Sequence, residues 1–80
     1  MEDTIARHVI RAIFRSETEL ENLIPLLKDQ CTPEEYKTYA RAIAAAIDGI
    51  NTNVLKKVLA SHPALPGAID ADIAKYGRLL

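Results

Sequence analysis

The side chains best suited to chemistry in this 80-residue chain are few and lie far apart in the sequence. Neither His8 nor His62 is followed by a second histidine or a carboxylate at metal-ligand spacing. Cys31 stands just before a predicted helix, where a thiolate is favoured, but it also suits a small packing role. Asp70 and Asp72 alternate without the glycine and later glutamate of a calcium loop. We therefore expect no catalytic residue, no bound metal and no cofactor, and a protein that is not an enzyme.

A stripe of three arginines near the N-terminus is directly followed by three glutamates. The arginines recur every four residues, which places them along one side of a helix. A basic stripe and an acidic stripe of one chain complement each other when two copies meet antiparallel. We expect the arginines to bind a partner, either a second copy or another protein. The arginines are Arg7, Arg11 and Arg15, and the glutamates are Glu17, Glu19 and Glu21.

The spacing of small and apolar residues around Gly49 resembles the helix-turn-helix of bacterial DNA-binding domains. Ala45 stands where that family has a small residue on the first helix, Gly49 makes the turn, and Ile50 enters the core. Leu55 and Val58 correspond to the apolar residues that fix the second helix. The resemblance covers about 20 residues and implies DNA contacts to bases or phosphates from Asn51, Thr52, Asn53, Lys56 and Lys57. The alternative interpretation is a pair of consecutive bundle helices with a glycine at the junction.

Composition is that of an ordinary globular domain. Apolar residues make up 49% and charged residues 26%, with a net charge of −1, so bulk charge does not favour nucleic acid. No apolar segment approaches the roughly 20 residues that cross a bilayer, and the acidic N-terminus is unlike a secretory signal. The single cysteine excludes an internal disulfide framework. We expect one domain, residues 1–80, in the cytoplasm and away from membranes.

Helical spacing of apolar residues predicts two helices in the first 30 residues, over about 3–15 and 17–30. The second would begin at a capping box formed by Ser16 and Glu19. Pro25 predicts a kink within it, because proline lacks an N–H and clashes with the preceding turn. Alternatively, the two segments form one continuous helix with Ser16 in its interior.

The clearest start signal in the chain is a capping box at Thr32 and Glu35 with Pro33 at the first helical position. It predicts a helix over 33–48 that Gly49 ends, since glycine readily adopts the left-handed conformation of a helix terminus.

Two further helices are predicted beyond Gly49, over about 53–61 and 68–76. His62 and Pro63 end the first, because the residue before proline avoids the helical region. Leu79 and Leu80 leave an apolar end that we expect to dock on a partner or on the chain's own core. The pattern does not decide whether the last helix packs in its own chain or on a neighbour.

These elements predict an all-α fold, a compact bundle of four to five short helices. Such helices are marginal alone, so packing must hold them. Leucine beyond the needs of one core favours a partner surface, and a symmetric homodimer is the commonest solution. We interpret the chain as a non-enzymatic, self-associating helical interaction module. The alternative is a helix-turn-helix DNA-binding protein with its turn at Gly49.

Overall fold

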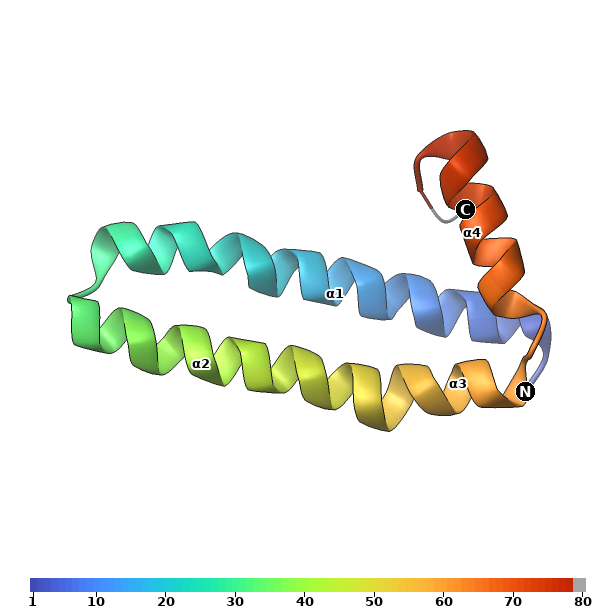
Figure 1. Ribbon diagram of the computed structural model, residues 1–80, viewed down its shortest axis with the longest axis horizontal. Helices are drawn as coiled ribbons and strands as arrows, with labels where there is room; N and C mark the ends of the chain where they lie inside the picture. Colours follow the sequence, from blue (N-terminus) through green and yellow to red (C-terminus); the bar gives the residue numbers. More distant parts are fainter. Residues whose placement is uncertain (79–80) are drawn as a thin grey trace.

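The computed structural model describes residues 1–78, which form three helical rods and no strand (Figure 1). Leu79 and Leu80 lie outside the described residues, and with them the predicted docking of the C-terminal leucines. The all-α prediction is confirmed. The first rod is α1 (Asp3–Gln30), the second joins α2 (Pro33–Ile50), η1 (Asn51–Leu55) and α3 (Lys56–Ser61), and the third is α4 (Leu65–Tyr76).

The first two rods lie antiparallel as a long hairpin, and α4 crosses it at the open end, near the N-terminus (Figure 1). The molecule measures 44 × 26 × 15 Å with a radius of gyration of 15.2 Å. A compact chain of this length would have a radius of about 12 Å. The prediction of a compact bundle of four to five helices is therefore not confirmed.

The break predicted between residues 15 and 17 is wrong, because α1 is one helix of 28 residues. Ser16 is exposed in its interior and caps nothing. Neither glycine nor proline interrupts the chain here, and the apolar spacing continues across Ser16. Pro25 has no N–H to donate to the preceding turn, and the helix nevertheless continues through that position to Gln30.

The predicted start of the second rod is confirmed. The Thr32 hydroxyl accepts a hydrogen bond from the Glu35 backbone N–H at 3.2 Å, and the Glu35 carboxylate accepts one from the Thr32 N–H at 3.0 Å. These bonds stabilise the ionised carboxylate and hold the pKa of Glu35 below its usual 4.5. The capping box therefore fixes the hairpin connection at the two residues Cys31 and Thr32.

Each long rod presents a seam of residues spaced alternately four and three apart, the pattern of paired supercoiled helices. Every seam residue is buried or half-buried, whereas the residues between them are mostly exposed. The shared spacing keeps the two rods in contact along the hairpin. The seam of α1 is Ala6, Ile10, Ile13, Glu17, Leu20, Ile24 and Leu27; that of the second rod is Tyr36, Ala40, Ile43, Ile47, Ile50, Leu55 and Val58.

The π-helical turn η1 corrects an irregularity in this seam. Ile47 and Leu55 are eight residues apart, whereas the repeat provides seven. A π turn widens the helix by one residue, as the hydrogen bond from the Lys56 N–H to the Asn51 carbonyl shows. Leu55 and Val58 therefore return to the side that faces α1.

The helix end predicted at Gly49 is wrong, and so is the separate helix over 53–61. Gly49 has no positive φ, and the rod runs unbroken from Pro33 to Ser61. Interior glycine costs a helix about 1 kcal/mol, which the packing of Ile50 and Leu55 against α1 offsets. The end at Ser61 is confirmed, with His62 outside the helical region before Pro63.

The last helix begins at Leu65, three residues before its predicted start, because Pro66 fits the first helical turn. It ends as predicted at Tyr76, where Gly77 adopts the left-handed conformation with φ of 73°. It packs on its own chain through the buried Leu65 and Ile69.

Among residues 1–78, the only fully formed core lies where α4 covers the hairpin. The buried apolar residues all belong to the open end or to α4 itself: Ala6, Ile10, Ile13, Val58, Leu65 and Ile69. In the loop half of the hairpin, residues 17–47, the seam is only half-buried, because two helices cannot enclose what lies between them.

Gly49, inside a helix, and Gly77, at a helix end, give a direct test of this architecture. Gly49→Ala should raise the free energy of unfolding by about 0.5–1 kcal/mol, since Gly49 is a helix interior residue. An added Cβ would meet only the Asn53 amide, at 3.9 Å. Gly77→Ala should destabilise by about 1 kcal/mol, since its φ is left-handed. Urea unfolding of both variants measures these changes in the free energy of unfolding. A destabilising Gly49→Ala would contradict a helical Gly49 and support the predicted turn at that residue.

Candidate functional site

The three arginines predicted to form one partner-binding stripe have different surroundings. Arg7 is half-buried, and its Nη1 lies 3.1 Å from Oδ2 of Asp72 on α4. Arg11 and Arg15 lie beyond that ion pair, next to a groove between α1 and the end of α4. The stripe is therefore divided: Arg7 forms an ion pair with α4, whereas Arg11 and Arg15 line the groove.

The residues predicted to contact DNA are not on a separate recognition helix. Asn51, Thr52 and Asn53 lie in η1, and Lys56 and Lys57 begin α3, all within the straight second rod. A helix-turn-helix needs a turn that sets two helices at a steep angle. Because the rod continues through Gly49, the predicted turn is absent. These side chains therefore do not lie on a second helix set at an angle to the first.

The groups singled out for chemistry lie apart and serve structural contacts. His62 is buried, and its Nδ1 lies 2.7 Å from Oδ1 of Asp3, which joins the end of α3 to the start of α1. His8 lies 3.4 Å from the Arg11 guanidinium. Cys31 is half-buried at the hairpin connection. Residues 1–78 contain no cluster of metal-ligating side chains.

The helices of residues 1–78 do not combine the length and apolar character that a bilayer crossing requires. The exposed apolar side chains are instead spread over the sides of amphipathic helices.

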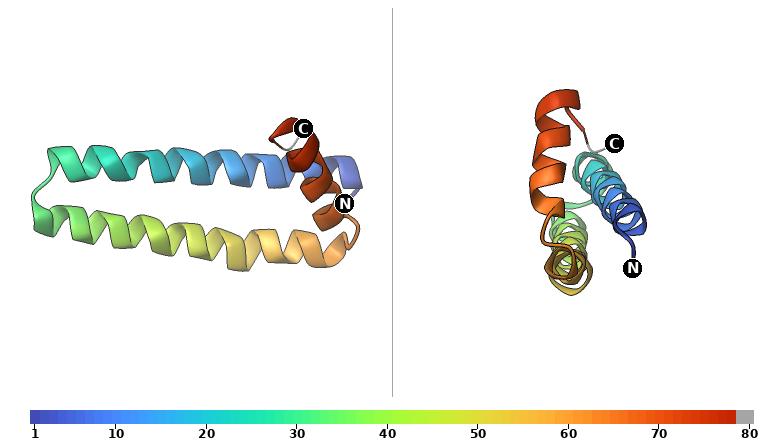
Figure 2. Two further views of the ribbon diagram at one scale, coloured as in Figure 1. Left: turned by 45° about the horizontal axis from the view of Figure 1, so that its top comes forward. Right: turned by 90° about the vertical axis from the view of Figure 1, so that its right-hand side faces the viewer.

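One side of the hairpin carries α4, and the other side is uncovered. On α1, Arg7 and Phe14 face α4, through the ion pair with Asp72 and the shared groove. Ile5 and Leu23 each lie nine residues from Phe14, which is two and a half helical turns, so both point the opposite way. The right-hand view of Figure 2 shows α4 on one side of the two long rods only.

Residues of the second rod extend this uncovered side. On α1 it is formed by residues that immediately precede seam residues. In an antiparallel helix pair, residues with the same relation to the seam lie on the same side. We call the resulting surface the open face. Its exposed apolar and small members are Ile5, Ala12, Ser16, Leu23, Leu26, Tyr39, Ala42, Ala46 and Val54; Glu19, Glu35 and Lys57 are its charged members, and Val9 and Gly49 are half-buried.

The open face combines exposed apolar side chains with small residues. Ile5 is 51% exposed, Leu23 41%, Tyr39 52% and Val54 43%. The alanines and the serine between them let another helix approach closely. Single exposed apolar residues are ordinary, but several of them along one side of a hairpin, with small residues between them, favour an interaction surface.

Charge is unevenly distributed along the hairpin. The loop half, residues 17–47, holds six acidic and three basic side chains. The open end, residues 1–16 with 48–62, holds five basic and three acidic side chains. The hairpin is therefore negative at one end and positive at the other, so two copies attract when they lie antiparallel.

Glu17 is the one charged residue in the seam, between Ile13 and Leu20. Its Oε1 is buried without a hydrogen-bond partner. Loss of hydration raises the pKa of Glu17 above the usual 4.5, and the nearby Glu21 raises it further. A polar seam residue lowers stability but restricts how helices align.

The sequence interpretation identified the arginines but missed the open face. Its members are mostly alanines and single apolar residues, which do not stand out by type. The available signal was their position: each immediately precedes a residue of the four-three repeat. That signal requires the two long helices to be recognised as continuous, which the apparent stops at Ser16 and Gly49 concealed.

The sequence matches no protein-family model, and neither a curated protein nor a solved structure is significantly similar to it. Its function is therefore argued from its own geometry.

Removing the Glu17 charge should stabilise the protein at neutral pH. A carboxyl whose pKa is raised by folding opposes folding when ionised, and this penalty disappears as pH falls through the raised pKa. Glu17→Gln should therefore increase the free energy of unfolding at pH 7, by up to about 1 kcal/mol. It should also flatten the gain in stability as pH falls from neutral toward 4.5.

Glu19→Gln is the matched control, since it removes the same charge from an exposed position two residues away. Denaturant unfolding from pH 4.5 to 7.5 at fixed protein concentration compares the variants. Identical pH dependence in both would show that the Glu17 environment has no energetic effect. The Glu35 carboxylate acts in the opposite direction, since its stabilisation is lost as pH falls through its lowered pKa.

Proposed function

We propose that this chain is a non-enzymatic helical interaction module that self-associates, with a second copy covering the open face. The observation that carries the proposal is the half-buried seam of the loop half, which no helix of residues 1–78 covers. The open face borders this seam with exposed Leu23 and Tyr39. A second hairpin would turn two helices into four and complete a core of the usual kind.

Charge supports a second copy as the occupant and an antiparallel arrangement. A two-fold axis across the hairpin places the acidic loop half of each copy beside the basic open end of the other. Such an interface is isologous, so each contact occurs twice. α4 lies on the far side of each hairpin and does not obstruct this arrangement.

The single cysteine suits a reducing compartment. On that ground we propose that the protein is located in the cytoplasm.

Paired alanine substitutions on α2 test the proposal. Ala46→Glu introduces a charge on the open face and should weaken dimerisation at least tenfold, since a buried unpaired carboxylate is costly. Ala44→Glu is the matched control, because Ala44 is equally exposed but follows the seam residue Ile43 on the other side. Sedimentation equilibrium of the wild type and both variants measures the dissociation constants.

The antiparallel arrangement adds a salt dependence. Dimerisation should weaken between about 50 and 500 mM salt, because surface charge attraction is screened. A wild type that stays monomeric at millimolar concentration contradicts the proposal. An equal effect of Ala46→Glu and Ala44→Glu shows that the dimer uses another surface.

A further inference from the structure

A groove of about 430 Å³ separates α1 from the C-terminal end of α4. The part of α4 from Leu65 to Asp72 is held against the hairpin by the buried Leu65 and Ile69 and by the Arg7–Asp72 ion pair. Toward its C-terminal end α4 rises away from α1 (Figure 1), and Ile73 is left 44% exposed. The divergence creates a wedge-shaped space of a size that small molecules occupy in proteins.

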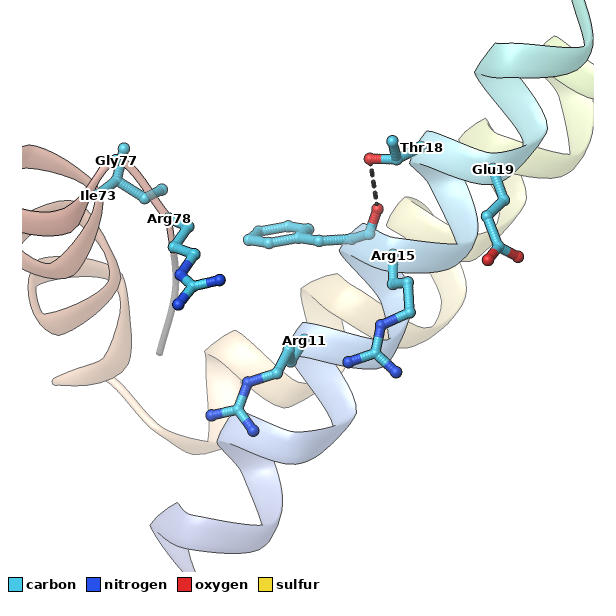
Figure 3. A pocket seen from close by; sticks show the side chains of 8 residues that line it. Arg11, Arg15, Thr18, Glu19, Ile73, Gly77 and Arg78 are labelled. Carbon is cyan, nitrogen blue, oxygen red and sulfur yellow. Dashed lines mark hydrogen bonds between the residues drawn. The ribbon is translucent and has the colours of Figure 1, made fainter.

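The groove is apolar between its walls. Phe14 lines it from α1, and Ile73 lines it from α4, where Figure 3 shows Ile73 on the far wall. Phe14 is only half-buried. Neither side chain is covered from the groove side, so an apolar group placed between them would remove both from water.

Three guanidinium groups surround this apolar space. Arg11 and Arg15 come from α1, one turn apart, and Arg78 comes from the segment after α4 (Figure 3). Among residues 1–78, none of the three forms an ion pair, in contrast to Arg7. The Arg11 Nε is buried without a hydrogen-bond partner. Guanidinium groups bind carboxylate and phosphate oxygens through paired hydrogen bonds.

The other polar residues of the groove do not compete with an anion at the arginines. The Thr18 hydroxyl already donates to the Phe14 carbonyl at 2.9 Å. Glu19 is the one carboxylate of the lining, and it lies beyond Arg15, away from Arg11 and Arg78 (Figure 3). The anion-binding part of the groove is therefore the side formed by Arg11 and Arg78.

We propose that this groove binds a small amphipathic anion. Its carboxylate or phosphate head contacts Arg11 and Arg78, and its alkyl or aromatic part lies between Phe14 and Ile73. The groove is on the α4 side of the hairpin, so this site is independent of the open face and of self-association.

Calorimetric titration of the full chain with decanoate tests the site, with decyl phosphate as the second head group and decanol as the uncharged control. Decanoate should bind with a dissociation constant of about 0.1–1 mM. Decanol should bind at least tenfold more weakly. The tighter of the two anions identifies the preferred head group.

Arg11→Gln should weaken decanoate binding about tenfold, as expected for one charged hydrogen-bonding group. Ile73→Ala should weaken it severalfold through the tail. The matched control is Arg41→Gln, which removes an exposed arginine from α2 far from the groove. Circular dichroism establishes that each variant folds.

Three results would overturn the proposal: decanol binding as tightly as both anions, Arg41→Gln weakening binding as much as Arg11→Gln, or neither anion binding at several millimolar.

Discussion

Two helices in contact cannot enclose a core, and this constraint determines the rest of the structure. The seam between α1 and the second rod is apolar along its whole length, but its residues become fully buried only where α4 adds a third helix. Deep burial of Ile10 depends on the α4 residues Leu65 and Ile69. The loop half has no such cover, so its apolar side chains keep part of their surface in water, a cost that a second molecule would remove.

The position of α4 divides the hairpin into two sides with different chemistry. The covered side has an arginine-lined groove where α4 diverges from α1. The opposite side has small and apolar residues that can approach another helix closely. Both follow from the position of α4, which is anchored through Leu65, Ile69 and Asp72 and lies on one side of the pair. The proposed partner and the proposed ligand therefore use separate surfaces of the same short chain.

Local sequence signals predicted helix ends correctly where the apolar seam did not continue past them. The Thr32 capping box and Pro33 fixed a helix start, and Pro63 fixed a helix end. At Ser16 and Gly49 the local sequence favours the end of a helix. The apolar seam continues across both positions through residues such as Ile13 and Ile50, and the helices continue with it. The π turn was not foreseeable from propensity, but the eight-residue interval between Ile47 and Leu55 was visible in the sequence. The apolar content of the sequence predicts a compact bundle, but it does not show whether the helices surround those side chains. Here only α4 adds a third helix to the hairpin, so the molecule is extended.

Amide hydrogen exchange at two protein concentrations tests whether a second copy covers the loop half of the hairpin. Backbone amides of residues 20–27 and 36–47 should exchange measurably more slowly at about 1 mM protein than at about 10 µM, because a second copy covers that half. Amides around Ile10 and Val58, which α4 already covers, should change less than those of the loop half. Exchange in the loop half that is independent of concentration would contradict the account.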